Sequence, residues 1–113
     1  RSFWRLGWGV AMSGDLYLPI DGTAASLPVH PSPESMFLRV ERETMRRFPG
    51  SNCVLFTIRT YVTPVVDVAS QSEVAQRLAD ALAALPGDVL DYKGLDVGAG
   101  ELITMLRRCV SQT

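Results

Sequence analysis

Two stretches of the chain, 36–48 and 53–62, flank the tetrapeptide Pro-Gly-Ser-Asn at 49–52, and this arrangement constrains the fold more than any other feature. Residues of these four types favour turns. The second stretch is a nearly continuous run of β-branched and aromatic residues, which is typical of a strand. The first stretch is compatible with one or two helical turns over 40–47, but the second needs a neighbouring strand to pair with. We therefore predict a long antiparallel hairpin.

A further strand is predicted near the N-terminus, because residues 3–12 alternate in size with the two-residue period of a half-buried strand. Its buried face would consist of Trp4, Leu6, Trp8 and Val10. The following segment, 13–35, contains the prolines at 19, 28, 31 and 33. Such a segment continues neither a helix nor a sheet, so it is predicted to be a long surface connection.

Two helices are predicted in the C-terminal part of the chain. Ser70 and Glu73 have the spacing of a capping box, and Pro86-Gly87 ends the helical pattern that follows. After a link over 88–94, a second helix is entered through Gly98-Ala99-Gly100. The predicted apolar faces are Val74, Leu78, Ala81, Leu82 and Leu85 in the first helix, and Leu102, Ile103, Leu106, Cys109 and Val110 in the second. The predicted fold class is α+β, with an antiparallel sheet and two C-terminal helices.

Three strands make a thin sheet, in which the outer edge of the hairpin has no partner. Complete domains usually cover an apolar strand edge of this kind. Residues 1–113 are therefore expected to form either a single domain or the C-terminal half of a larger one.

The overall charge and composition exclude several classes of protein. Eleven basic and twelve acidic residues give a net charge of −1, whereas a nucleic-acid-binding module normally has a positive excess. No apolar run approaches the roughly 20 residues of a membrane span. No targeting or lipidation signal is visible. The two cysteines, Cys53 and Cys109, are predicted to be reduced and buried. We therefore expect a cytoplasmic protein without nucleic-acid or membrane partners.

Few residues are candidates for chemistry by type and spacing alone. The single histidine, His30, lies among prolines without a cluster of other metal-ligating residues, so a solvent-exposed loop residue is favoured over a metal ligand. Ten of the eleven basic residues are arginines, and five of these lie on the predicted hairpin, interleaved with Glu41 and Glu43. Cross-strand ion pairs explain this pattern, and so does recognition of a carboxylate ligand by the planar guanidinium group.

Two motifs of the hairpin resemble a known family. The run LRVERETMRRFP at 38–49 and the run VLFTIRTYVTP at 54–64 are similar to the LRVERQTLRRLP and FTIRTY-Pro elements of the heme-dependent oxidative N-demethylases. Arg5-Leu6-Gly7-Trp8 and Tyr92-Lys93-Gly94-Leu95 look like two further elements of that family. The sequence departs from the family's pattern at Gly7, Glu43, Met45 and Phe48. The N-terminal half of the family's domain, with a His-x-Pro-Val-Pro element, has no counterpart in this sequence.

The resemblance implies a PAS-like heme domain that contains heme b. In such enzymes, heme iron activates dioxygen with electrons from a separate reductase, and a small secondary amine, such as dimethylamine, is oxidised to a primary amine and formaldehyde. A chain that carries the missing N-terminal half is a further expected partner. The alternatives are a non-enzymatic PAS-type module that senses heme or a small ligand, and a structural remnant without a ligand.

By resemblance, the arginines of the hairpin pair with the heme propionates, and aromatic residues pack against the porphyrin. The residues expected to bind the cofactor are Arg39, Arg42, Arg59, Trp8, Phe56 and Tyr61. Glu41 is expected to meet either the ammonium group of the substrate or a structural arginine, and His30 is a weak candidate for the metal ligand. Which of these side chains share a face depends on the strand register, because a slip of one residue reverses every assignment.

Overall fold

The computed structural model describes residues 2–16 and 27–111. Their elements are β1 (Ser2–Ala11), the short 3₁₀ helix η1 (Pro33–Ser35), β2 (Phe37–Phe48), β3 (Cys53–Pro64), α1 (Val65–Ala69), α2 (Ser72–Ala84), α3 (Gly87–Tyr92) and α4 (Ala99–Ser111). The predicted α+β class is confirmed. Part of the predicted surface connection, including Pro19, lies outside the described residues.

The described strands form one antiparallel sheet in the order β1-β2-β3. The hairpin pairs twelve residues on each side, from Phe37 opposite Pro64 to Phe48 opposite Cys53, which confirms the strand prediction for 36–48. At the turn, Gly50 and Asn52 have φ angles of 94° and 56°, a left-handed conformation that favours glycine and asparagine. The proline, glycine and asparagine of the turn thus fix the register of both faces.

Two helices of the structure were not predicted. Residues 65–69 form α1, whose first amide, at Val65, donates to the carbonyl of Met36 and so anchors the helix beside β2. Residues 87–92 form α3, where a link was predicted. Both helices are too short to display an apolar repeat, so periodicity does not reveal them.

The predicted capping box is wrong. The hydroxyl of Ser70 donates to the carbonyl of Asp67 at the end of α1, and α2 begins at Ser72. Ser70 therefore serves the end of one helix rather than the start of the next. The apolar face of α2 is also rotated from the predicted one, because Ala75 and Ala79 are buried whereas Val74 is exposed.

The core lies where the helices meet one end of the sheet. Its fully buried side chains of largest volume are Met36, Leu82, Leu95, Leu102, Leu106 and Val65. From β1, Val10 belongs to this core and Trp8 packs against it. Trp4 and Leu6, predicted to be buried on the same face, are 59% and 58% exposed. They lie beyond the reach of the helices.

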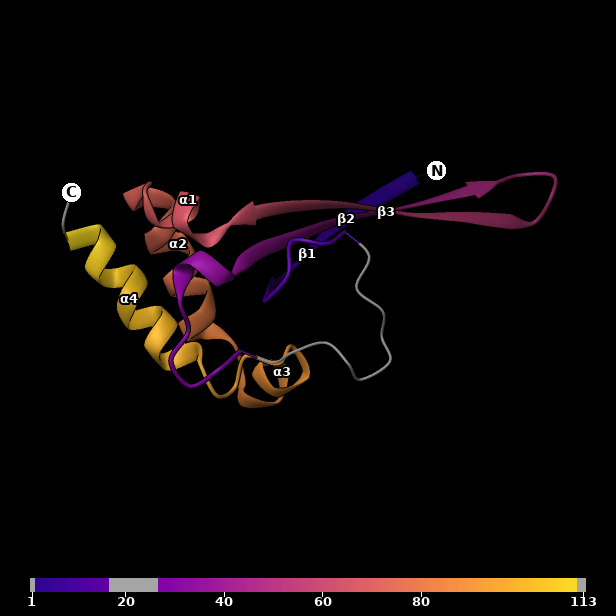
Figure 1. Ribbon diagram of the computed structural model, residues 1–113. Helices are drawn as coiled ribbons and strands as arrows, with labels where there is room; N and C mark the ends of the chain where they lie inside the picture. The colour runs from indigo at the N-terminus through magenta and orange to yellow at the C-terminus, as the bar shows by residue number, and fades with distance from the viewer. Residues whose placement is uncertain (1, 17–26, 112–113) are drawn as a thin grey trace.

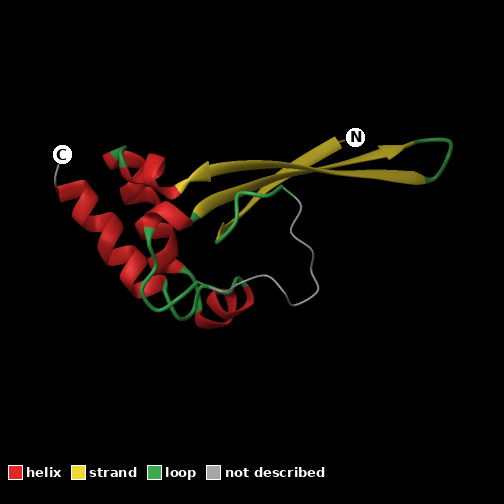
Figure 2. Cartoon of the chain, in the orientation of Figure 1, coloured by secondary structure: helices red, strands yellow, loops and turns green. Residues whose placement is uncertain are grey.

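The rest of the hairpin projects away from the helices, so that the chain measures 56 × 32 × 26 Å along its principal axes. Figures 1 and 2 show the helices gathered at one end and the turn of the hairpin at the other. The prediction that Cys53 is buried is wrong, because the residue lies next to the turn and is exposed. Within the described residues, every helix is too short or too polar to span a membrane.

Candidate functional site

The register of the sheet divides the predicted site residues between two faces, since successive residues of a strand point to opposite sides. We call one side the arginine face; it consists of Trp4, Leu6, Trp8, Val40, Arg42, Thr44, Arg46, Leu55, Thr57, Arg59 and Tyr61. We call the other side the salt-bridged face; its charged and large apolar side chains include Phe3, Arg5, Arg39, Glu41, Glu43, Met45, Arg47, Val54, Phe56 and Ile58.

Two arginines lie directly opposite each other on the arginine face. Arg42 of β2 is paired with Arg59 of β3, and Leu6 of β1 completes the row. Like charges in directly opposite positions destabilise a sheet. The described residues place no carboxylate on this face to offset the repulsion. The described strands therefore leave both guanidinium groups without a carboxylate partner on this face.

Aromatic rings hold the guanidinium groups of this face. Arg42 lies 5.2 Å from the ring centroid of Trp4, and Arg59 lies 5.2 Å from that of Tyr61. The planar guanidinium group stacks well on an aromatic ring and keeps its N–H donors at its edges. The rings therefore restrict where the arginine side chains lie without occupying their hydrogen-bond donors.

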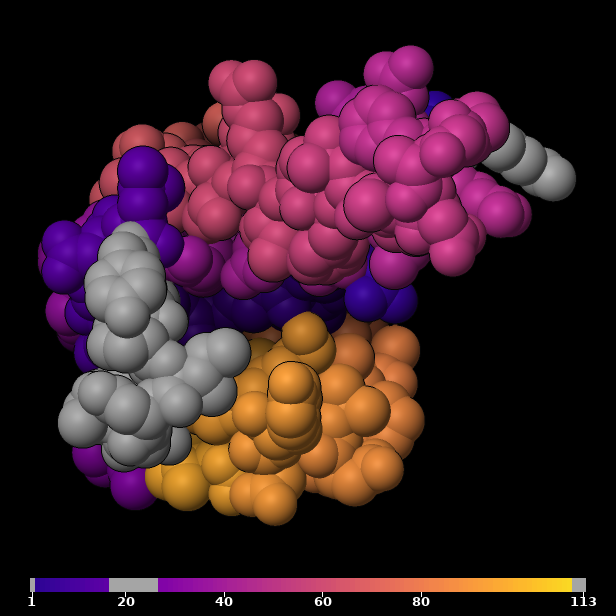
Figure 3. Space-filling view, turned by 90° about the vertical axis from the view of Figure 1, so that its right-hand side faces the viewer, coloured from indigo at the N-terminus to yellow at the C-terminus, as the bar shows by residue number. Residues whose placement is uncertain are grey.

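An apolar row lies next to the arginine pair, on the side of the helices. It consists of Trp8, Val40 and Tyr61, one residue from each strand. Lys93, which follows α3, donates to the backbone carbonyl of Trp8, and its ammonium group lies 5.4 Å from the Trp8 ring centroid. In Figure 3, β1 (indigo) lies between the hairpin (pink) and the region of α3 (orange). The arginine face thus combines an apolar surface with a cationic edge.

The salt-bridged face has a different character, because four of its five charged strand residues are paired, Arg47 being the exception. Arg39 contacts Glu41 at 3.2 Å and also donates to the carbonyls of Asp15 and Leu16. Arg5 contacts Glu43 across the β1–β2 pair at 2.5 Å. The expected cross-strand pairing occurs between β1 and β2, at Arg5–Glu43, whereas Arg39–Glu41 lies within β2. Both contacts leave these arginines less available to a ligand.

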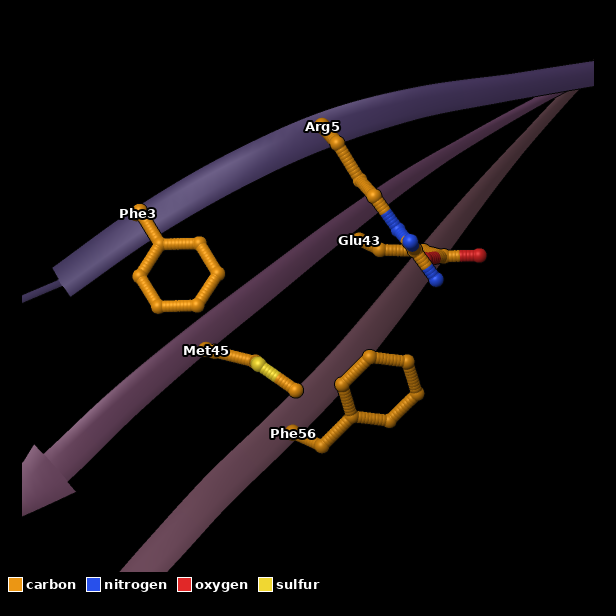
Figure 4. Close-up of a pocket in the computed structure, with 5 residues that line it drawn as sticks. All are labelled: Phe3, Arg5, Glu43, Met45 and Phe56. Carbon is orange, nitrogen blue, oxygen red and sulfur yellow. The ribbon is translucent and has the colours of Figure 1, made fainter.

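A hollow of about 260 Å³ opens on the salt-bridged face (Figure 4). Phe3, Met45 and Phe56 form its apolar part, and the Arg5–Glu43 ion pair lies at one end. The three apolar side chains lie in one row of the sheet, which the turn fixes through the register. Phe3 and Met45 are not among the predicted cofactor residues, although the alternation of the strands places them beside Phe56.

The structure therefore brings together four of the predicted cofactor residues and separates them from the others. Arg42, Arg59, Trp8 and Tyr61 lie on the arginine face, whereas Arg39, Glu41 and Phe56 lie on the salt-bridged face. A ligand that lies on one face of the sheet contacts one group only. Lys93 is not among the predicted site residues, although it contacts Trp8. The Tyr-Lys-Gly motif at 92–94 was the one sequence feature that could have indicated its role.

The predicted metal ligand His30 lies apart from both groups. Its Nδ1 atom is 2.8 Å from a carboxylate oxygen of Glu101 in α4, and its side chain is 84% exposed. The described residues contain no group of three or more histidine, cysteine or acidic residues that could hold a metal ion. His30 thus has the environment of the exposed loop residue that the sequence favours.

A comparison with known protein families agrees with the resemblance in the hairpin. Residues 1–103 match the family described as "Haem-dependent oxidative N-demethylase, alpha subunit-like". The match covers the whole sheet, both faces described above and the Tyr-Lys-Gly motif. The chain therefore belongs to the alpha subunit-like family of the heme-dependent oxidative N-demethylases.

Proposed function

We propose that this chain contributes the arginine face of its sheet to the heme site of an oxidative N-demethylase that acts on a small secondary amine. The observation that carries the proposal is the unneutralised pair of Arg42 and Arg59 beside the apolar row of Trp8, Val40 and Tyr61. A heme has a flat apolar body and two propionates at one edge. The two parts of this face have the chemistry to receive those two parts of the cofactor.

The arginines would bind the propionates, and the apolar row would lie against the porphyrin. Arginine forms two parallel hydrogen bonds to a carboxylate, so Arg42 and Arg59 each have the donors to hold a propionate. Lys93, beside Trp8, is a further cation at the margin of this face. Among the described strand residues, this face carries no histidine, and its side chains of a type that can bind heme iron are Tyr61 and, beside the turn, Cys53. We propose that a second polypeptide segment provides a histidine ligand for the iron. His30 remains a candidate to be tested.

The family's name supports an oxidative N-demethylation that depends on heme. Heme b, when bound, would supply the activation of dioxygen: with two electrons from a separate reductase and two protons, one oxygen atom would hydroxylate a methyl group of the amine, which leaves as formaldehyde, and the other would form water. The chain's own residues position the cofactor and exclude water from its apolar side. The ammonium group of the substrate would need a carboxylate. Glu41 was predicted for this role, but it lies on the opposite face of the sheet and contacts Arg39. With heme on the arginine face, we therefore propose that the carboxylate comes from the second polypeptide segment.

The proposal is tested by titrating the purified chain with hemin and with hemin dimethyl ester, which has no free carboxylate. We expect a saturable shifted Soret band with hemin. Replacing Arg59 by alanine should weaken hemin binding about tenfold or more, because a hydrogen bond to a charged group contributes about 1.5–3 kcal/mol. The ester should bind more weakly and should not respond to Arg59→Ala. Arg77→Ala, on the exposed surface of α2, is the matched control.

Two results would contradict the proposal. Equal binding of hemin and its ester would show that the propionates meet no arginine, and unchanged hemin binding in Arg59→Ala would remove this residue from the site. In a reconstituted holoenzyme, Glu41→Gln should leave the KM for the amine unchanged, and a raised KM would place the substrate on the salt-bridged face instead. Heme binding without amine-dependent turnover in that holoenzyme would instead support a sensor module.

A further inference from the structure

The outer edge of β3 is a second feature that calls for a partner, independently of the heme site. β3 is twelve residues long and pairs with β2 on one side only, and the described residues place no strand on its other side. A strand edge presents a row of backbone N–H and C=O groups with unused hydrogen-bonding capacity. An edge of this length is able to accept another strand.

β3 also has few of the features that normally protect an edge. Proteins block edges with short strands, bulges, prolines or lysines. The register of β3 with β2 is continuous over all twelve pairs, and β3 contains no lysine and no proline before its last residue, Pro64. The opposite edge, β1, differs because the ammonium group of Lys93 already donates a hydrogen bond to the backbone carbonyl of Trp8. The two edges of the sheet are therefore not equivalent.

The side chains near this edge indicate what the partner strand carries. On the salt-bridged face, Phe56 and Ile58 are 47% and 53% exposed, and Phe56 lines the apolar hollow. Figure 4 shows the Phe56 ring directed toward Met45, with Phe3 beyond it. A strand beside β3 would cover this surface with apolar residues at every second position, because alternate side chains of a strand share a face.

The charge near the turn of the hairpin is complementary to an acidic segment. Arg46 and Arg47 lie opposite Leu55 and Val54 of β3 and point to opposite faces. Arg46 contacts the ring of Phe48, and within the described residues neither arginine has a carboxylate partner. The segment 37–64 holds five of the eleven basic residues and two of the twelve acidic ones. β3 lies between these arginines and an incoming strand, which would run about 10 Å from β2. Carboxylate side chains at the end of that strand beside the turn would reach across β3 toward Arg46 and Arg47.

We propose that β3 accepts an antiparallel strand from another polypeptide segment, with apolar residues over Phe56 and Ile58 and acidic residues beside Arg46 and Arg47. Antiparallel pairing continues the pattern of the sheet and places the acidic residues at the C-terminal end of the incoming strand. The proposal uses neither Arg42 nor Arg59. Its failure and the failure of the heme proposal are therefore distinguishable.

The probe is the peptide Ac-TVTVTVEE-amide, with Ac-TVTVTVKK-amide as its matched control, each titrated into the full chain. We expect the acidic peptide to shift the backbone amide resonances of residues 53–60 and to leave those of β1 unchanged. It should bind about tenfold more tightly than the basic peptide, which is the effect of two surface ion pairs. The double variant Arg46→Glu/Arg47→Glu should invert this preference. The control variant Arg77→Glu/Arg107→Glu changes the net charge by the same amount but on the helices, so it should keep the preference for the acidic peptide.

Three outcomes would overturn the proposal: no binding of either peptide, equal affinity for both, or resonance shifts that map to β1. A saturable dimer in sedimentation, with the β3 amides protected and no response to peptide, would assign the edge to a second copy instead. Circular dichroism shows whether each variant keeps its fold. Arg46→Gln/Arg47→Gln provides a milder second test, in which the acidic peptide should lose its advantage.

Discussion

The two ends of the sheet differ in what packs against them. At the helix-covered end, Val10 of β1 and Met36, just before β2, are buried against residues of α1, α2 and α4. At the projecting end, both faces of the hairpin are exposed, and their large apolar side chains lie in water (Figure 1). The same strands run through both regions. The difference shows that strand formation in this chain comes from the hairpin itself, whereas burial comes from the helices.

Exposed apolar residues on both faces of one hairpin are uncommon in a solitary domain, and they mark surfaces that bind something. The helix-covered end therefore contributes most of the free energy of folding, whereas the projecting end provides exposed surface to which other molecules can bind. Four comparisons between paired variants test this division.

The largest expected effect comes from one substitution made at both ends. Leu102 of α4 is fully buried, whereas Leu55 of β3 is 47% exposed. Leu102→Ala should lower the free energy of unfolding by about 2–5 kcal/mol, because the lost contacts leave a cavity. Leu55→Ala should change it by about 0.5 kcal/mol or less. Urea denaturation measures both, and equal losses would show that the projecting end is packed in solution.

A pair of glycines gives the next effect. A Cβ atom on Gly98 would meet the backbone carbonyl of Pro28, with the side chain of Leu27 at 3.0 Å. Gly98→Ala should therefore destabilise the chain by about 1–3 kcal/mol. Nothing lies within 4 Å of the corresponding position on Gly9, so Gly9→Ala in β1 should stabilise the chain by about 0.5–1 kcal/mol. Thermal unfolding followed by circular dichroism should show Tm shifts of opposite sign.

A third comparison concerns the two faces of the projecting end. A double-mutant cycle of Arg42→Gln and Arg59→Gln should give a repulsive coupling energy of about 0.2–1 kcal/mol in the chain without ligand. The contacts of each arginine with its own aromatic ring cancel in the cycle. A cycle of Arg5→Gln and Glu43→Gln should give an attractive coupling of similar size. Both couplings should shrink at high salt. An attractive Arg42–Arg59 coupling would mean that an anion already joins them.

The sequence predicted the hairpin well because its signals are local. The turn residues, the β-forming run of β3 and the left-handed conformation of Asn52 agree with one another. The short helices α1 and α3 could not be predicted, because tertiary contacts such as the bond from Val65 to Met36 stabilise them. The burial of Cys53 was wrongly predicted, because an apolar strand pattern does not reveal where the helices stop covering the sheet.

The candidate site could be predicted only in part. Family motifs supplied the residue types, and the register divided them between two faces. Glu41 and Arg42 are adjacent in the sequence and point to opposite sides of the sheet. Lys93 reaches Trp8 from a sequence separation of 85 residues, a contact that no local pattern encodes. The site is therefore a property of the register and of the position of α3.

The smallest effect is expected at η1, where the chain enters the helix-covered end. The hydroxyl of Ser32 donates to a carboxylate oxygen of Glu34 at 2.5 Å, and this bond, with a smaller backbone contribution, lowers the pKa of Glu34 below its ordinary value of 4.5. A lowered pKa in the folded state contributes stability above the unfolded-state pKa, and this stability is lost as the pH falls through the folded-state pKa. Ser32→Ala should raise the Glu34 pKa toward 4.5 in an NMR titration. Ser35→Ala, which leaves the Ser32–Glu34 bond intact, should not change it. An unchanged Glu34 pKa in Ser32→Ala would show that water replaces the Ser32 hydroxyl at the Glu34 carboxylate. This part of the helix-covered end would then be as solvated as the projecting hairpin.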